Sequence, residues 1–464
     1  MDKSDTFYNV EISATLKLKT PMLIGEGDNG LDNRLVACKT NKGAAYLPGS
    51  SIKGSLFSIA SDPEVSVWVF GRKPKEKSDD DLGKGGSVRF LDALAVSPVN
   101  TVTNVRNSIE RTTGTAKDSH LFELEMVSEN TEFEVKLQID KANRERLDQI
   151  KSLLTAWGAA ENSLGRGANQ SYGEFLVLDI SIQGVAEEEQ QNWLMTLLSG
   201  DSKPDQQPAQ TKIDNIDGNK LNNWDTSGGL QINIDLIPLG PVFVGNEKPE
   251  KKKSDENTVL KPRRNKDGYV VLPSTSFRGV MRSQAEKIIA TLLDLEACEQ
   301  PPVEGLFGST DLKSRLRISD FIAEKAGKST EQTMLAIDRF TGAIKSGATY
   351  NVERVDTGKL KGKITLDWNL LKPELHAELA LLFMLIRDLF DAELIFGAYK
   401  AKGFGKVTAV ARFKGSEKVL SNWSEFYQAW EERSLINGIE VPSMDTLEKS
   451  FTAKFVSEKE KADV

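Results

Sequence analysis

The chain has 464 residues, of which 39% are hydrophobic and 28% charged, a balance typical of a folded protein with two or three domains. It contains neither an apolar run long enough for a membrane span nor a basic stretch leading into an apolar one at its start, so we expect no membrane and no secretion signal. Cys38 and Cys298 are far apart and no CxxC spacing occurs, which predicts a cytoplasmic protein with reduced thiols and no structural zinc.

Most of the net charge of −8 lies in two acidic segments, 187–225 and 416–464, so a basic surface elsewhere is not excluded. A basic stretch at 248–266 is, by charge alone, more typical of a solvated loop than of a phosphate site.

The predicted elements of the first half alternate between strands and helices. Alternating apolar residues predict a strand at 8–14, and Ile52, Leu56 and Ile59 share one face of the helix that follows. Further elements are strands near 87–91 and 133–139, a helix at 144–159 and a closing strand after a glycine cluster.

The second half repeats this order. It begins with a strand at 230–236 and a helix that carries Phe277, and it continues with a helix at 374–391 and a closing strand after its own glycine cluster. The succession strand, helix, strands, helix, strand predicts an α+β fold with a ferredoxin-like (RRM-like) domain in each half. Sheets of this kind often recognise RNA.

Six sequence blocks occur twice in the same order, roughly 220 to 237 residues apart. The pairs are 20–25 with 239–245, 46–54 with 271–279, 69–71 with 306–308, 87–93 with 316–321, 108–116 with 336–344, and 164–175 with 401–407. Because chance agreement over six ordered blocks is implausible, we expect two homologous domains.

Composition predicts where these domains begin and end. The expected divisions are a first domain at 1–190, an acidic, polar linker at 191–227, a second domain at 228–415 and an acidic tail at 416–464. The tail contains Trp423, Phe426, Tyr427 and Trp430 at helical spacing, a stripe that more often packs on a core than binds a partner.

A proline-led turn precedes the first helix of each half. In the first half, Gly49, Ser50, Ser51 and Lys53 follow Pro48 in the sequence PGSSIKG. Serines at a helix start and the outward amides of its first turn suit an anion, and a lysine adds charge beside them. The second half has Ser274, Ser276 and Arg278 at the matching positions. The alternative is an ordinary strand-to-helix turn.

A glycine cluster near the end of each half combines adaptable backbone with cations. The candidate RNA-binding residues are Arg166 in the first half and Lys402, Phe404 and Lys406 in the second. Backbone amides next to glycine can approach phosphates, and Phe404 or Tyr172 could stack on a base. A tight turn is the simpler explanation of a single GxG.

Together, the PGSSxKG turn, an I-[DE]-R-x-T-G block before a hairpin and a late G-[FY]-G cluster resemble the RAMP superfamily of CRISPR-associated proteins. The similarity spans 8–185 and 228–413 and is greatest to backbone subunits of type III effector complexes. A tandem fusion resembles the double subunit of type III-D systems. The resemblance implies a β-hairpin thumb in each domain, at 109–134 and 337–366, and RNA contacts by Arg111 and Arg339 of the repeated block.

The resemblance also implies partners and a reaction. Backbone subunits grip guide RNA, contact target RNA and neighbouring effector subunits, and in many type III members cut the target within the assembled complex. The position that matches the cleaving aspartate is Asp32, which would act with a divalent metal, expected to be Mg²⁺. In the second half, Asp255 or Glu256 could take this role. Asp32 could also be a solvated loop acid, with Asp28 and Glu26 as nearby competitors.

Two other functions are compatible with the sequence. One is a backbone subunit that has no catalytic role. The other is an endoribonuclease that processes precursor guide RNA, but such an enzyme would typically need a dedicated base. His120 is a candidate in the first half only, because the second half has no counterpart.

Overall fold

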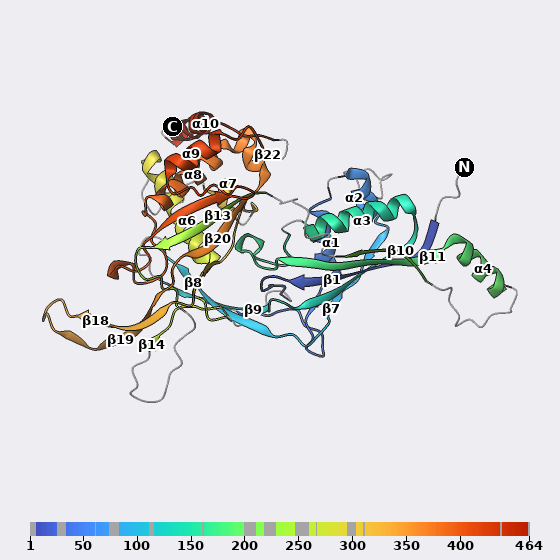
Figure 1. The fold of residues 1–464 in the computed structure, drawn as a ribbon, viewed down its shortest axis with the longest axis horizontal. Coiled ribbons are helices and arrows are strands. Elements are labelled where there is room, and N and C mark those ends of the chain that lie inside the picture. Colours follow the sequence, from blue (N-terminus) through green and yellow to red (C-terminus); the bar gives the residue numbers. More distant parts are fainter. Residues whose placement is uncertain are drawn as a thin grey trace. The chain divides into compact units, whose positions relative to one another are not determined.

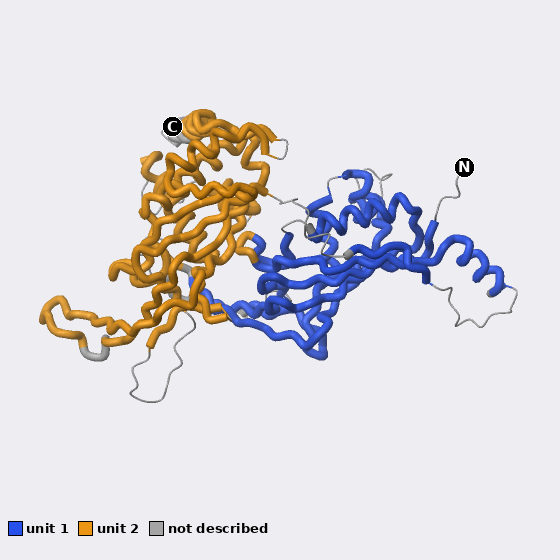
Figure 2. The backbone as a smooth tube through the Cα atoms, in the orientation of Figure 1, with its two compact units in different colours: residues 1–107, 121–168, 172–228 blue, residues 108–120, 169–171, 229–464 orange. Residues whose placement is uncertain are grey.

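The protein folds into two compact units in a computed structural model, each with its own hydrophobic core (Figures 1 and 2). Unit 1 comprises 1–107, 121–168 and 172–228, and unit 2 comprises 108–120, 169–171 and 229–464. The structure describes residues 6–25, 34–60, 62–73, 83–110, 116–159, 162–198, 210–217, 229–245, 259–265, 267–294, 303–309, 311–436 and 439–462.

The first repeat is built on one antiparallel sheet with the order β12-β11-β1-β10-β7-β3, and β6 also pairs with β10. Its strands are β1 (Thr6–Leu18), β3 (Tyr46–Leu47), β6 (Val88–Phe90), β7 (Ala93–Ala95), β10 (Glu132–Asn143), β11 (Phe175–Ala186) and β12 (Thr211–Asp217). Alternate residues of β1 are buried, as the alternation in the sequence predicts.

Helices cover one face of this sheet (Figure 1). They are α1 (Gly49–Phe57), α2 (Pro63–Phe70) and α3 (Arg144–Ala159), and α4 (Glu187–Leu198) follows β11. Ile52 of α1 and Trp157 of α3 are fully buried in the core that these helices share with the sheet. Short elements complete the repeat: β2 (Arg34–Leu35), β4 (Gly71–Arg72), β5 (Lys84–Gly85) and the 3₁₀ helix η1 (Ala168–Gln170).

The second repeat has the equivalent sheet, in the order β15-β17-β20-β13-β21 with β16 paired to β20. Its strands are β13 (Leu230–Pro238), β15 (Val271–Leu272), β16 (Leu316–Ile318), β17 (Phe321–Ala323), β20 (Leu360–Leu366) and β21 (Val407–Phe413). Its helices are α6 (Ser274–Leu293), α7 (Glu304–Phe307), α8 (His376–Phe390) and the 3₁₀ helices η2 (Trp368–Leu371), η3 (Pro373–Leu375) and η4 (Lys400–Lys402). The matching elements therefore run β1-α1-β6-β10-α3-β11 and β13-α6-β16-β20-α8-β21.

A β-hairpin extends from each repeat, and its position differs from the one expected from sequence. The hairpins are β8 (Thr101–Ile109) with β9 (Ala116–Val127), and β18 (Lys328–Ile337) with β19 (Ile344–Asp356). β2 lies parallel to β9, and β14 (Val259–Leu260) lies parallel to β19. The hairpins thus start before the expected 109–134 and 337–366, while β10 and β20 belong to the central sheets. In the second repeat the I-D-R-F-T-G block forms the turn of the hairpin and does not precede it.

The segments expected to be linker and tail contain folded elements. Within 191–227, β12 pairs with β11, and Lys151 of α3 forms an ion pair with Asp214 of β12. After residue 415 the chain forms α9 (Trp423–Glu431), β22 (Leu435–Ile436), β23 (Ile439–Glu440) and α10 (Met444–Ala462). Phe426 and Trp430 are fully buried beside Phe383 of α8, so the aromatic stripe packs on the core of unit 2. None of the helices in the described ranges is long and apolar enough to cross a membrane.

Candidate nucleic-acid interface

The helix start after each proline-led turn is capped from inside the fold. The amide of Gly49 donates to Asp92 Oδ1 over 2.8 Å, and the amide of Ser274 donates to Asp320 Oδ1 over 2.7 Å. These carboxylates satisfy the first amide of α1 and α6 and place a negative charge at the positive end of each helix. The attraction for phosphate predicted from the helix start is therefore partly offset by an internal acid.

The residues predicted around these turns differ in accessibility. Ser50 is exposed, Ser51, Lys53 and Ser276 are half-buried, and Gly49 is buried. Ser274 is only 1% exposed, and its hydroxyl donates to a backbone carbonyl, so it is a packing residue rather than an RNA contact. The polar surface at this turn is thus larger in the first repeat than in the second.

Arg278, the counterpart of Lys53, is held inside unit 2. Its guanidinium donates to the backbone carbonyls of Phe307 and Leu316 and stacks on the Phe307 ring at 5.4 Å. Burial, together with repulsion from Arg282, lowers the pKa of Arg278 to about 10. This arginine is therefore engaged with the end of α7 and the edge of β16, and a phosphate would have to displace internal hydrogen bonds to use it.

The glycine cluster of the first repeat forms a tight backbone crossing. Gly165 has a φ of +83°, and a side chain there would overlap the Leu23 carbonyl. The next amide, of Arg166, donates to that same carbonyl over 2.8 Å, and the amide of Gly173 donates to Pro21 O over 3.0 Å. Only glycine fits this close approach, and the result is that the exposed Arg166 side chain is fixed at its base.

The second repeat has the same crossing, but at residues that the sequence alignment missed. Gly397 has a φ of +80°, the amide of Ala398 donates to Phe243 O over 2.8 Å, and the amide of Gly405 donates to Pro241 O over 2.8 Å. The counterpart of 165–167 is therefore 397–399, and Arg166 corresponds to Ala398. The cations of the second cluster, Lys402 and Lys406, are exposed but occupy other positions.

The two aromatic residues considered for base stacking are buried. Tyr172 is 5% exposed and packs with Leu23 and Met126, while Phe404 is 2% exposed and packs with Phe243 and Met334. Lys402 instead lies over the Tyr350 ring, with its Nζ 5.4 Å from the ring centre. Tyr172 and Phe404 thus pack against strands of the hairpin in their own repeat and present no ring face to a base.

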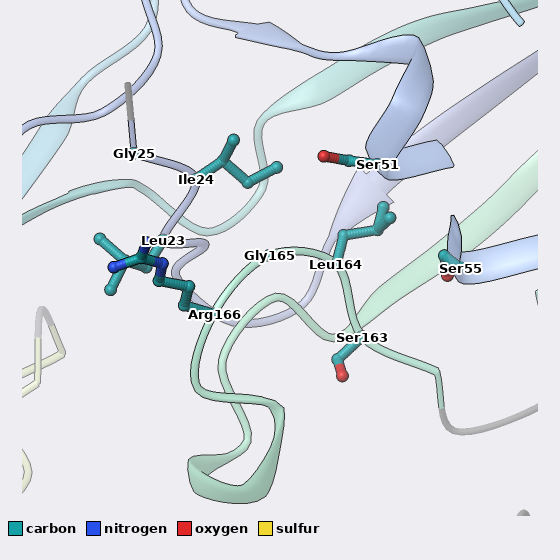
Figure 3. A pocket seen from close by; sticks show the side chains of 9 residues that line it. All are labelled: Leu23, Ile24, Gly25, Ser51, Ser55, Ser163, Leu164, Gly165 and Arg166. Carbon is teal, nitrogen blue, oxygen red and sulfur yellow. The ribbon is translucent and has the colours of Figure 1, made fainter. Parts of the chain in front are cut away.

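A cleft in the first repeat brings two predicted motifs together (Figure 3). It has a volume of about 360 Å³. Its lining comprises Ser51 and Ser55 of α1, 163–166 of the glycine cluster, and 23–25 of the segment after β1. Serine hydroxyls and one arginine therefore line a single concavity together with the apolar side chains of Leu23, Ile24 and Leu164, and hydroxyls and guanidinium groups are donors that phosphate oxygens accept from.

The tip of the second hairpin is a defined turn. Asp338 accepts hydrogen bonds from the amides of Phe340 and Thr341, at 3.0 and 2.9 Å, and from the Thr341 hydroxyl. These bonds, led by the one from the Thr341 amide, hold the pKa of Asp338 below its usual value. Arg339 is exposed and Phe340 is fully exposed, so the turn presents a cation beside an aromatic ring. Arg111, which follows β8 in the sequence, lies outside the described residues.

The predicted catalytic residues Asp32, Asp255 and Glu256 also lie outside the described residues, and their role remains a prediction. The residues that flank them are described. Gly25 bridges to Ala37, and Gly245 bridges to Pro262, so described residues from the two sides of each acid-bearing segment lie side by side. The chain then continues as β2 or β14 along the second strand of the hairpin. Within the described ranges, no three His, Cys, Asp or Glu side chains are grouped so that they could hold a metal.

Sequence reasoning missed three features of this surface. Asp92 and Asp320 lie in a repeated block, and their shared position before a strand was the available signal. Gly397 was hidden because Tyr399 replaces Gly167 in the same left-handed conformation, with a φ of +60°. Phe340 was overlooked because the block around it was expected before the hairpin and not at its tip.

Comparison with known families agrees with the repeat. The model of the RAMP superfamily matches residues 15–175 and 235–408, one match in each repeat. No curated protein matches the chain. Since the matched residues make up well over half of the chain, the protein belongs to the RAMP superfamily, whose members are components of CRISPR complexes.

Proposed function

We propose that the protein is a guide-RNA-binding double backbone subunit of a type III CRISPR effector complex, resembling the fused subunits of type III-D systems. The observation that carries the proposal is the duplication of a whole arrangement: sheet, capped first helix, glycine crossing and hairpin. The strand order β11-β1-β10-β6 and its counterpart β21-β13-β20-β16 support a ferredoxin-like reading of each half. A backbone subunit stacks along RNA, so two equivalent units in one chain would occupy two successive positions on the guide.

RNA contacts in this proposal come from exposed polar groups, not from the buried aromatic residues. The first-repeat cleft offers the Ser51 hydroxyl and Arg166, and Lys53 lies on the same helix, α1, as Ser51. The second repeat offers Lys402, Lys406 and the hairpin tip with Arg339. Such donors recognise phosphate and sugar without reading sequence, as a subunit that accepts any guide requires.

The proposal includes target RNA cleavage by the assembled complex. Asp32 is the first candidate, with Asp255 or Glu256 in the second repeat. Carboxylate and phosphate oxygens together favour a divalent cation such as Mg²⁺, which would supply Lewis-acid stabilisation of the departing oxygen. The described residues supply no such ligand set, so the ligands would have to come from outside them and from RNA. The support for cleavage is therefore the family resemblance, together with the pairing of β2 and β14, the described strands that follow the acid-bearing segments in the chain, with the hairpins.

The deciding experiment measures target binding and cleavage by the assembled complex with single amide substitutions. Asp32→Asn is expected to abolish one cut while target affinity stays within about twofold, since removing a carboxylate removes no phosphate contact. Asp28→Asn is the matched control, because it removes an acid of the same segment. Asp255→Asn and Glu256→Gln test the second repeat separately. Wild-type cutting in all four variants would leave a backbone subunit that binds RNA without a catalytic role.

A further inference from the structure

A partly buried ion pair connects the first hairpin to the segment that follows β2. Lys39 Nζ lies 2.6 Å from Glu125 Oε1, and the glutamate side chain, on β9, is only 7% exposed. Burial favours the protonated acid, but hydrogen bonds from the side chains of Lys39 and Thr101 and from the Ala37 amide hold the pKa of Glu125 below its usual value. The carboxylate is thus fully engaged by donors from two other segments.

The second repeat contains the same arrangement. Arg264 Nη2 lies 2.8 Å from Glu353 Oε1, and the glutamate side chain, on β19, is 13% exposed. The Ser329 hydroxyl donates to the same oxygen over 2.6 Å. Arg264 belongs to the basic stretch that charge alone assigned to a solvated loop, yet its guanidinium also donates to Gly268 O over 2.7 Å.

Strand pairing shows that the two arrangements are equivalent. Leu35 pairs with Leu124 and Leu260 pairs with Val352, both in parallel. In each repeat the acid comes directly after the paired residue of the hairpin, and the cation comes four residues after the paired residue of the short strand. Thr101 and Ser329 both lie at the start of the first hairpin strand, so cation, acid and hydroxyl occur twice at matching places.

The pair joins three parts of each repeat. Besides contacting the hairpin, the segment after β2 is bonded to the residues that follow β1, through Cys38 N to Ile24 O at 2.7 Å. The corresponding bond in the second repeat is Arg263 N to Val244 O, also 2.7 Å. Leu124 and Met126 of the first hairpin, and Met334 and Val352 of the second, lie in small clusters separate from the main cores, whereas Val127 belongs to the main core of unit 1 and Val355 packs with Ala323 of β17. Apolar contact between each hairpin and its central sheet therefore rests on few residues.

An ion pair with a buried carboxylate and a partly exposed cation is a poor source of stability, because the cost of removing the charges from water offsets much of their attraction. Such a pair instead favours one relative orientation of the two segments that carry it, since only one geometry satisfies both charges. A pair of this kind at the same joint in both repeats fits a role in orienting the hairpin better than a role in holding the fold together.

We propose that Lys39–Glu125 and Arg264–Glu353 are positioning residues. Each pair sets the orientation of its hairpin relative to the segment that follows the predicted catalytic acid in the chain. The inference rests on the proposed function, in which hairpin and acid-bearing segment must meet the same RNA. The segment held by Lys39 begins two residues after Asp32, so a misplaced hairpin changes the position of target RNA relative to that acid.

The first test needs no RNA and uses hydrogen exchange in the full chain. Lys39→Met and Glu125→Gln should raise exchange of the β9 amides by about tenfold or more, while Lys39→Arg, which copies the second repeat, keeps it within about twofold. Arg264→Met, Glu353→Gln and Arg264→Lys make the same comparison on β19. Unchanged exchange in the Met and Gln variants would overturn the inference, whether or not the protein cuts RNA.

The second test separates positioning from stability with the double variant Lys39→Met/Glu125→Met. An apolar pair of similar size should return the urea midpoint of the chain close to the wild-type value, because no buried charge is left alone. The hairpin amides should still exchange faster, and in the assembled complex the first-repeat cut should slow by about tenfold with target affinity within about twofold. If the apolar pair restores wild-type exchange, the Lys39 and Glu125 side chains act only by filling space and their charges are not needed. That result would overturn the proposal. A wild-type complex that cuts no RNA would instead refute the proposed cleavage and leave the exchange test decisive.

Discussion

The two repeats share a backbone but place their cations differently. Both cross the chain after the first strand with the same hydrogen bonds, from Arg166 to Leu23 in one and from Ala398 to Phe243 in the other. In the first repeat the crossing carries an exposed arginine, and in the second an alanine. On the first helix the cations Lys53 and Arg278 also differ, since the arginine is bonded to internal carbonyls.

Comparing the repeats shows which structural features both retain and which differ between them. Both repeats retain the glycines of the crossing, the aspartate caps and the partly buried ion pairs. At these positions another residue would clash with the backbone or leave a buried polar group without a partner. The variable features are exposed cations, which can move along a phosphate-binding surface at little cost in folding free energy. The proposed RNA-binding surface should therefore contact phosphates in both repeats, but through different side chains.

The largest expected effect tests the shared crossing. A side chain at Gly173 would overlap the Leu164 carbonyl, and one at Gly405 would overlap the Phe396 carbonyl, both at positive φ. Gly173→Ala and Gly405→Ala should each destabilise their own repeat by roughly 2–4 kcal/mol. Urea unfolding followed by hydrogen exchange in each repeat measures the two effects separately.

Gly54 and Gly279 provide the matched control. Both lie in the first helix of their repeat, and a side chain there would meet nothing within 4 Å. Gly54→Ala and Gly279→Ala should leave stability unchanged or raise it by about 0.5–1 kcal/mol, because alanine favours helix over glycine. A similar loss at all four positions would mean that the crossing is no more constrained than an open helix face.

The second prediction concerns the internal arginine. Arg278→Met removes the donor of two buried carbonyls and should lower the stability of the second repeat by roughly 1–3 kcal/mol. Lys53→Met, at the matching place, should change stability by less than about 0.5 kcal/mol. Equal losses of stability would contradict the assignment of Arg278 as internal and Lys53 as available to RNA.

The third prediction tests the aspartate caps. Asp92→Ala and Asp320→Ala each remove the acceptor for the first amide of a helix and should cost about 1 kcal/mol in the repeat concerned. Because the carboxylate also opposes phosphate at that helix start, RNA affinity of the folded fraction should rise, not fall. Urea unfolding and filter binding on the same samples measure both effects, and a fall in affinity without unfolding would assign the acids to RNA binding.

Much of the fold could be predicted because periodicity and repetition reflect packing. The helix expected at 144–159 is α3 with the same bounds, and the one expected at 374–391 is α8 at His376–Phe390. The hairpin bounds were wrong because the I-D-R-F-T-G block has no periodicity of its own. Its conformation depends on Asp338, whose side chain closes the turn through bonds that spacing does not reveal.

The site was less predictable because residue identity does not determine backbone conformation at each position. Gly167 and Tyr399 both adopt the left-handed region, so matching glycine to glycine moved the alignment away from Gly397. Burial was equally hidden: Phe404 occurs in a glycine-rich loop, as a stacking residue would, yet it is buried against Met334 and Val352 of the second hairpin. The repeated ion pairs were accessible in principle, because the offsets between the repeated blocks already pair Glu125 with Glu353.

The fourth prediction sharpens the difference in cations. Arg166→Ala should weaken binding of single-stranded RNA to the full chain and reduce the log–log salt slope by about one unit, as expected for one lost phosphate contact. Ala398→Arg is the reverse change at the matching place and should raise the slope by up to about one unit. If neither substitution alters the slope, the crossing does not face RNA in either repeat.

The smallest expected effect is confined to the tip of the second hairpin. Asp338 has a lowered pKa because its carboxylate accepts the Thr341 and Phe340 amides, so the turn is stabilised above the pH at which an unfolded aspartate ionises, about 3.9. That stabilisation is lost as pH falls through the lower folded value. Asp338→Asn should therefore speed exchange of the Phe340 and Thr341 amides at pH 7, corrected for intrinsic rates, and the difference from wild type should vanish in acid. Asp338→Glu copies Glu110 of the first repeat, and its longer side chain should protect these amides less well than aspartate does. Equal protection in all three proteins would show that strand pairing alone forms the turn of the second hairpin and that the Asp338 carboxylate adds nothing to it.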